Sequence, residues 1–246
     1  MIFRKPHETE PGFPWLDFDD HFDFPDARQS AGDAPLAQGG NLSPGMLLSA
    51  YRQGIFPWFS EGEPILWWSP DPRFVIYTNK VHVSSSMRKF LRQKRFRITF
   101  DSCFTTVMRH CAAAYRPGQR GTWITEDMIS AYSRLHERGF AHSVEVWQGE
   151  FLVGGLYGVS TGGIFCGESM FSQVSNSSKT GFLTLARHLK EIGVPLVDSQ
   201  VHTDYLESLG AEYLDRSEYL RILESRADLP DLQGSWTNRF PEIIDW

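Results

Sequence analysis

A carboxylate and an amide lie two residues apart at the end of an apolar segment, "PLVDSQ", at residues 195–200. Residues i and i+2 of a strand share one face, so Asp198 and Gln200 are expected to point the same way. A carboxylate beside an amide can accept a proton from an amine or orient it. The plain alternative is a polar strand end that caps a neighbouring helix.

A second acid, Glu168, interrupts the otherwise apolar segment "GIFCGESMFS". Burying an unpaired carboxylate costs free energy, so this side chain needs a partner. A cationic substrate and a structural arginine are equally good partners on the sequence alone.

The segment "RKFLRQKRFR", residues 88–97, carries six basic residues and no acid, although the chain as a whole has a net charge of −6. Arg88, Arg92 and Arg95 recur at i, i+4 and i+7, which gives a helix a basic face. Guanidinium and ammonium groups on an exposed face suit phosphate. A solvated surface helix is the alternative.

Aromatic residues gather in the stretch 51–76, which also holds four prolines. The prolines restrict this stretch to turns and short extended pieces. Together with Trp123, tryptophans such as Trp58 are expected either to wall a pocket for a bulky apolar side chain or to form the core of a small domain. Both interpretations can hold at once.

The elements that must position these residues follow from apolar periodicity and from turn residues. A helix is expected after Ser43 and Pro44, ending at Gly54. The predicted strands are residues 74–77, 96–100, 142–147, 150–160, 163–172 and 195–200. The predicted helices are residues 84–93, 102–114, 125–139, 178–193 and 203–211. A turn at 161–163 should join two of the strands as a hairpin, so the order predicts an α+β fold with a mixed sheet covered by helices.

A boundary is expected near "SPDPR", residues 69–73. It divides the chain into a small N-terminal domain, residues 1–72, and a catalytic domain, residues 73–246. Residues 1–35 form an acidic arm with aromatic anchors. The three cysteines contain no CxxC pair, which favours a reducing compartment and no zinc site. The chain shows neither a signal peptide nor an apolar run of membrane-spanning length, so a cytoplasmic protein without membrane association is expected.

Several familiar motifs do not fit. "GESMFS" has Phe171 where the nucleophile elbow G-x-S-x-G needs its last glycine. "GGLYGVSTGG" matches neither G-x-G-x-x-G nor the P-loop, and no H-E-x-x-H occurs, so these motifs predict no metal site.

Seven motifs in order resemble the bacterial leucyl/phenylalanyl-tRNA–protein transferase family, from about Leu36 to about Trp236. They are "GIFPWFSEGEPILWWSPDPR", "GTWIT", "HSVEVW", "LVGGLYGV", "FCGESMFS", "SKTGFLTL" and "DSQVHTDYLESLGA". The resemblance implies an enzyme without a cofactor that moves Leu, Phe or, less well, Met from aminoacyl-tRNA to the N-terminal Arg or Lys of a protein. The product is marked for degradation in the N-end rule pathway. The implied fold is similar to that of acyl-CoA N-acyltransferases, the GNAT-like fold, with a small extra N-terminal domain, and a monomer is expected.

The resemblance also implies roles for particular residues. Asp198 and Gln200 match the catalytic strand end, and Glu168 matches the acid on the acceptor side. Substrate binding falls to Trp58, Trp123, Leu156, Phe165 and Ser169. Binding of tRNA falls to Arg88, Lys89, Arg92, Lys94 and Arg95. Two positions depart from the family pattern: Ser199, expected to face away from the substrate, stands where Cys is frequent, and Leu156 stands where Met is common.

Attack of an amine on an activated ester requires that the amine is neutral, that it is correctly oriented toward the ester carbonyl, and that the oxyanion is stabilised. We expect the Gln200 carbonyl, polarised by Asp198, to contact the attacking amine, with Asp198 or water as the alternative final proton acceptors. Two other classes of protein share some of these sequence features. A CoA-dependent acetyltransferase needs a pyrophosphate loop that "SQVSNSSKTG" does not supply, and a non-catalytic RNA- or peptide-binding adaptor has no need of the Asp198 and Gln200 pair.

Overall fold

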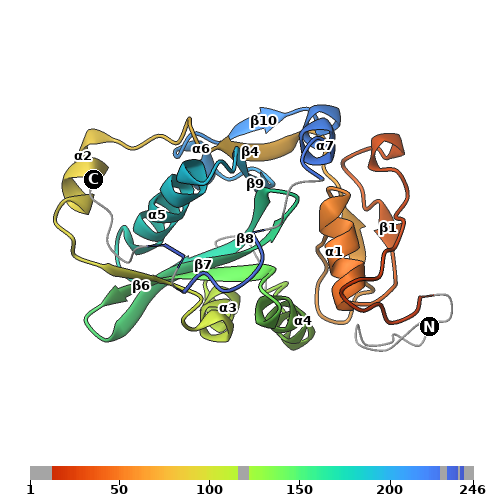
Figure 1. Cartoon of the computed structure of the whole chain (residues 1–246), viewed down its shortest axis with the longest axis horizontal. Helices are drawn as coiled ribbons and strands as arrows, with labels where there is room; N and C mark the ends of the chain where they lie inside the picture. The colour runs from red at the N-terminus through yellow and green to blue at the C-terminus, as the bar shows by residue number, and fades with distance from the viewer. Residues whose placement is uncertain (1–12, 116–121, 228–231, 238, 241–246) are drawn as a thin grey trace.

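The protein contains two β-sheets of unequal size (Figure 1). The structure is a computed structural model, and it describes residues 13–115, 122–227, 232–237, 239 and 240. The small sheet is antiparallel, in the order β1 (Ala37–Gln38), β3 (Leu66–Trp68), β2 (Phe56–Pro57). A short 3-10 helix, η1 (Ala27–Gln29), and helix α1 (Pro44–Arg52) accompany it. Pro44 begins α1 directly after the N-cap Ser43, as the sequence predicts.

The large sheet has the order β10-β4-β9-β8-β7-β6-β5. Its strands in chain order are β4 (Arg73–Tyr77), β5 (Arg97–Phe100), β6 (Ala141–Gln148), β7 (Phe151–Thr161), β8 (Ile164–Ser172), β9 (Leu196–Gln200) and β10 (Glu212–Leu214). The remaining helices are α2 (Ser85–Leu91), α3 (Phe104–Ala113), α4 (Glu126–Glu137), α5 (Ser177–Glu191), α6 (Asp204–Glu207) and α7 (Arg216–Glu224). Among the described residues, all pairs of neighbouring strands are antiparallel except β8 and β9.

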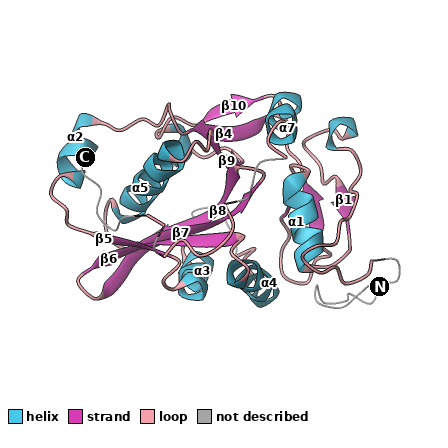
Figure 2. Ribbon diagram, in the orientation of Figure 1, coloured by secondary structure: helices cyan, strands magenta, loops and turns pink. Residues whose placement is uncertain are grey.

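Helices cover both faces of the large sheet, with α5 on one side and α3 and α4 on the other (Figure 2). Each side has its own hydrophobic cluster. The first cluster joins α1, α3 and α4, with buried members such as Met46, Val107 and Tyr132. The second joins α2 and α5, with Met87, Leu91 and Phe182 among its members. Met87 and Leu91 thus give α2 an apolar face that packs into the cluster on the α5 side of the sheet.

The predicted fold class is confirmed: it is a mixed sheet covered by helices, with a small N-terminal region. The sequence analysis predicted neither β10 nor α7, and it did not predict the two- and three-residue strands β1, β2 and β3. The chain changes from the small sheet to the large one between Trp68 and Arg73, where the boundary was placed. The division into 1–72 and 73–246 stays a prediction, because α1 packs on α4 and β7 across it, and residues 1–12 of the acidic arm lie outside the described residues.

The segment after α7 returns to the sheet and buries Trp236 completely. The indole stacks on the His142 ring with 3.7 Å between ring centroids, and the Trp236 backbone N–H donates to Asp101 Oδ2 at 2.7 Å. Burial acts to raise the pKa of Asp101, but the hydrogen bonds, above all that from His142, lower it below its ordinary value. The carboxylate thus ties the C-terminal segment to the start of β6.

Replacement Trp236→Ala is expected to lower the free energy of unfolding by ~3–5 kcal/mol, since it leaves a cavity that rigid neighbours cannot fill. Urea denaturation measures the loss. Trp236→Phe, which retains an aromatic ring, is the matched control and should lose less. A Trp236→Ala protein within about 1 kcal/mol of the wild type would show that this segment does not hold the fold together.

Candidate functional site

A cavity of about 680 Å³ opens where β8 and β9 part. These two parallel strands are paired only at Phe165 with Val197 and at Cys166 with Asp198. β8 continues to Ser172 and β9 to Gln200 without further pairing between them. Gly167, Glu168 and Ser169 of β8 face the cavity from one strand, and Ser199 and Gln200 of β9 from the other. The divergence of two strands therefore creates the site.

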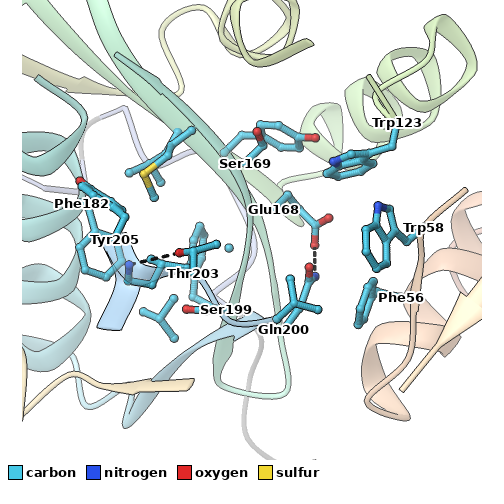
Figure 3. Close-up of a pocket in the computed structure, with 18 of the residues that line it drawn as sticks. Phe56, Trp58, Trp123, Glu168, Ser169, Phe182, Ser199, Gln200, Thr203 and Tyr205 are labelled. Carbon is cyan, nitrogen blue, oxygen red and sulfur yellow. Dashed lines mark hydrogen bonds between the residues drawn. The ribbon is translucent and has the colours of Figure 1, made fainter. Parts of the chain in front are cut away.

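The cavity has two walls that belong to the two hydrophobic clusters. Leu156, Phe165 and Phe182 line it from the α5 side of the sheet. Phe56 and Trp123 line it from the side of α1 and α4. Figure 3 shows Glu168 and Gln200 between the two groups, with Trp58, Trp123 and Phe56 on one side and Phe182, Tyr205 and Thr203 on the other.

Glu168 lies at the centre of the cavity and is 9% exposed. Its Oε1 accepts hydrogen bonds from the Tyr51 hydroxyl at 2.7 Å and from Gln200 Nε2 at 2.8 Å. The Tyr51 hydroxyl also lies 2.5 Å from that of Tyr132, so a chain of hydroxyls leads from α4 through α1 to the acid. Oε2 is buried and has no hydrogen-bond partner.

Burial raises the pKa of Glu168 to about 7, although the hydrogen bonds from Tyr51 and Gln200 oppose this shift. Burial likewise raises the pKa of Tyr51 and of Tyr132 well above their ordinary value, and the nearby Glu168 carboxyl adds to both shifts. Both hydroxyls therefore stay protonated and act as donors near neutral pH. A carboxyl that changes charge near pH 7 is suited to proton transfer.

Asp198 is fully buried and does not line the cavity. Arg73 donates to it twice, from Nε at 2.9 Å and Nη2 at 2.6 Å, and the Tyr219 hydroxyl donates at 2.8 Å. The Gln200 backbone N–H donates to Oδ1 at 2.9 Å. Both oxygens are thus occupied, and the contact with Gln200 fixes the turn that carries this amide.

Gln200 departs from strand geometry, with φ of 64°. In this left-handed conformation the alternation of side chains breaks, so Ser199 and Gln200 both line the cavity. The expectation that Asp198 and Gln200 share a face is wrong, because it assumed extended backbone through Gln200. For the same reason Ser199, expected to face away from the substrate, lies on the cavity wall.

The structure brings most of the candidate residues together. Trp58, Trp123, Leu156, Phe165 and Ser169 all line the cavity with Glu168 and Gln200. Trp58 is 41% exposed, so its ring borders the open side. The basic candidates lie apart from the cavity lining, exposed on α2 and the turn after it: Arg88, Lys89, Arg92, Lys94 and Arg95.

The sequence analysis did not point to several residues of the site, among them Arg73, Tyr219, Tyr51 and Tyr132. Arg73 offered a signal, since it opens the apolar strand "RFVIY" just as Glu168 interrupts one. Burial acts to lower the pKa of Arg73, but the Asp198 charge beside it raises the pKa above its ordinary value. The tyrosines offered none, because an aromatic residue in an amphipathic helix is typical of a core position.

Among the described residues, His202, Asp204 and Glu207 form a group whose ligand atoms lie within 4.8 Å of one another. All three are exposed, and His202 hydrogen-bonds to Glu207. No metal role follows, because exposed polar groups of this kind commonly pair with each other in water. No helix in the described part of the chain is both long and apolar enough to cross a membrane.

Two solved structures resemble the fold only distantly. A GCN5-related N-acetyltransferase from Kribbella flavida matches with a TM-score of 0.32 and 11% identity over 70% of this chain and 61% of its own. The structure of L-PGS from Bacillus licheniformis matches with a TM-score of 0.38 and 8% identity over 63% and 56%. These scores are too low to support a comparison of sites.

Sequence relatives are much closer. A leucyl/phenylalanyl-tRNA--protein transferase from Cellvibrio japonicus is 53% identical over 233 residues, which cover 93% of this chain and 98% of the relative. One from Syntrophus aciditrophicus is 51% identical over 222 residues, or 90% and 92%. The family model for leucyl/phenylalanyl-tRNA protein transferase matches residues 75–224, and the model for its N-terminal domain matches residues 40–71. The chain therefore belongs to the leucyl/phenylalanyl-tRNA protein transferase family and is an aminoacyltransferase.

Proposed function

We propose that this protein transfers Leu, Phe and, less well, Met from aminoacyl-tRNA to the N-terminal Arg or Lys of acceptor proteins in the cytoplasm, acting as a monomer. The transfer forms a peptide bond and marks the acceptor for degradation in the N-end rule pathway. The observation that carries the proposal is the apolar cavity of about 680 Å³ that meets a buried carboxyl and amide, Glu168 and Gln200.

The cavity suits the donor. Leu156, Phe165 and Phe182 offer an apolar wall to an unbranched bulky side chain, with Met170 and Leu206 beside them. Such a wall discriminates by only ~1–3 kcal/mol per methylene, which fits an enzyme that accepts Leu, Phe and Met alike. The aliphatic Leu156 on this wall tunes the preference among them.

The opposite wall suits the end of the tRNA. An aminoacyl ester brings its terminal nucleoside with it, and aromatic rings beside a cavity stack well on a base. Trp58 is exposed enough to offer its ring, and Trp68 supports it with ring centroids 5.6 Å apart. We therefore place the nucleoside against Trp58 and Trp123, in contrast to the expectation that both tryptophans wall the side-chain pocket.

One assay separates the three candidate classes. The protein is incubated with labelled Phe-tRNA and an Arg-initiated peptide, and separately with acetyl-CoA. Transfer of label to the peptide supports the proposed function. Turnover of acetyl-CoA indicates an acetyltransferase, and binding of either substrate without turnover indicates an adaptor.

Replacement Asp198→Asn is expected to slow transfer ~100-fold at constant donor binding. The lost charge weakens the hold on Arg73 and on the Gln200 backbone N–H, and a displacement of about 1 Å at a reacting centre costs about this much. Single-turnover transfer, corrected for the folded fraction, measures the effect.

Asp198→Ala is a poorer test, because it leaves the Arg73 guanidinium buried and unpaired, at a cost of ~3–5 kcal/mol in stability. If folded Asp198→Asn protein transfers at the wild-type rate, the carboxylate serves only the stability of the sheet.

The double replacement Arg88→Ala with Arg92→Ala is expected to weaken the use of aminoacyl-tRNA and to flatten its salt dependence, since fewer counterions are released on binding. An aminoacyl-adenosine donor lacks the tRNA body and should be used at the wild-type rate. Kinetics at several salt concentrations with both donors give the answer. Equal loss with both donors would mean that α2 has a structural role only.

Trp58→Ala and Leu156→Ala are expected to act differently if the two walls hold different parts of the donor. Trp58→Ala should raise the KM for Phe-adenosine and leave the ratio of Leu to Ile transfer unchanged. Leu156→Ala should lower that ratio, because a larger pocket admits the β-branched side chain. The ratio is measured with matched tRNA concentrations, and a melting curve for each variant shows that it is folded. If the ratio of Leu to Ile transfer changes in Trp58→Ala but not in Leu156→Ala, the tryptophans line the side-chain pocket and the proposed placement of the nucleoside is wrong.

A further inference from the structure

Glu168 is the one carboxyl among the described residues that line the cavity, and no His, Lys or Cys lines it. Asp198, the nearest alternative, has both oxygens occupied by Arg73, Tyr219 and the Gln200 backbone, and faces away from the cavity lining. The amide nitrogen of Gln200 is committed as a donor to Glu168. Glu168 is therefore the strongest base among the described residues that line the cavity.

The two oxygens of Glu168 are unlike. Oε1 accepts hydrogen bonds from Tyr51 and Gln200, whereas Oε2 is buried and has no hydrogen-bond partner, on a side chain that lines the cavity. A buried hydrogen-bond acceptor without a partner lowers the free energy of unfolding. The fold therefore keeps Oε2 unpaired at a cost in stability. Tyr51 is itself held by Tyr132 at 2.5 Å, so the direction of the carboxyl is set by α1 and α4 together.

We infer that Glu168 is the catalytic base that takes the proton of the attacking α-amine on Oε2, and that Tyr51 and Tyr132 are positioning residues that hold Oε1. The inference rests on the proposed function, since it assigns a step of that same transfer.

The protons balance as follows. An α-amine has a pKa of about 7.7–8.0 and arrives largely as an ammonium with three N–H protons. Glu168 takes the first proton, and the nitrogen lone pair then forms a bond to the ester carbonyl carbon. As the bond from carbon to the ribose oxygen breaks, protonated Glu168 gives its proton to that oxygen and takes the second proton from nitrogen. The amide keeps the third, and the proton left on Glu168 passes to solvent after the products leave.

The surroundings of Glu168 suit a group that takes and returns a proton near neutral pH. Burial raises its pKa to about 7, the Tyr51 and Gln200 hydrogen bonds lower it, the Asp198 charge raises it and the Arg73 charge lowers it. The titratable and charged groups that face it are Tyr51 of α1, Tyr132 of α4, Arg73 of β4, Cys166 of β8 and Asp198 of β9. Tyr157 of β7 packs against Tyr132 behind them.

The competing role for Glu168 is a clamp for the guanidinium or ammonium group of the acceptor's Arg or Lys. A clamp works best with two free oxygens that stay charged, since an arginine fork binds both at once. Glu168 offers one oxygen and is largely protonated below pH 7. The two roles differ in what a replacement changes: a clamp affects the KM for the acceptor, and a base affects kcat and its pH dependence.

The test is the pH profile of kcat at saturating acceptor for the wild type, Glu168→Gln, Tyr51→Phe and Tyr132→Phe. We expect the wild-type rate to rise with pH through a midpoint near pH 7, the pKa of Glu168. Glu168→Gln should lose this rise and lower kcat ~10²–10⁴-fold, the usual contribution of a general base. Tyr51→Phe should move the midpoint to higher pH, since it removes a donor that favours the charged carboxyl. Tyr132→Phe should move it the same way by less, because it acts through Tyr51.

Tyr219→Phe is the matched control, a buried tyrosine whose hydroxyl donates to Asp198 instead. It is expected to leave the midpoint in place, whatever its effect on the rate. One acceptor peptide serves all variants, so the titration of its own amine cancels. A Glu168→Gln enzyme with wild-type kcat, an unchanged profile and a raised KM for the acceptor would identify a clamp and overturn the inference. Absence of transfer by the wild type would instead refute the proposed function.

Thermal denaturation gives a readout without activity. The pKa of Glu168 in the folded protein, about 7, lies above its ordinary value of 4.5, so between these pH values the folded state holds a proton that the unfolded state has lost. The wild-type Tm should therefore fall, relative to that of Glu168→Gln, as the pH rises from about 4.5 to 7. The buried Glu145, whose pKa burial also raises, contributes equally to both proteins. Parallel curves for the two proteins would contradict the inference.

Discussion

The buried ion pair of Arg73 and Asp198 is the interaction on which the site depends. It joins β4 to β9 at the residue where β9 leaves β8. Two charges removed from water in this way cost several kcal/mol each, so a pair of this kind persists only with full hydrogen bonding. Tyr219 and the Gln200 backbone supply the additional donors. The pair therefore fixes the strand end, and the strand end fixes the cavity.

The cavity then draws on both faces of the sheet. Divergence of β8 from β9 lets the apolar clusters on the two faces meet at one opening, which neither cluster could line by itself. Between them stands Glu168, held by a helix of the small N-terminal region and by α4. The N-terminal region thus contacts the site directly, since Tyr51 hydrogen-bonds to Glu168 and Trp58 lines the cavity. This shared construction explains why one hydrophobic cluster crosses the predicted boundary between domains.

The sequence predicted the elements well because long amphipathic helices and apolar strands carry strong periodic signals. It also placed Glu168, Gln200 and the tryptophans at a common site, in part through the resemblance to a family. It could not place Tyr51, which hydrogen-bonds to Glu168 across 117 positions of the chain, or Tyr132, which hydrogen-bonds to Tyr51 across 81 positions. The pairing of Arg73 with Asp198, across 125 positions, likewise depends on β4 lying beside β9 in the sheet, which the sequence did not predict. The misplacement of Asp198 had a local cause: the left-handed Gln200 breaks an alternation that holds only for extended backbone.

The most direct test of the account is a crystal structure with a stable donor analogue, 3′-amino-3′-deoxyadenosine acylated with phenylalanine. The account predicts that the adenine ring lies against Trp58 and Trp123, that the phenyl ring lies against Leu156, Phe165 and Phe182, and that the carbonyl lies between them beside Glu168 and Gln200. An analogue bound outside the opening between β8 and β9, with this cavity left empty, would contradict the account.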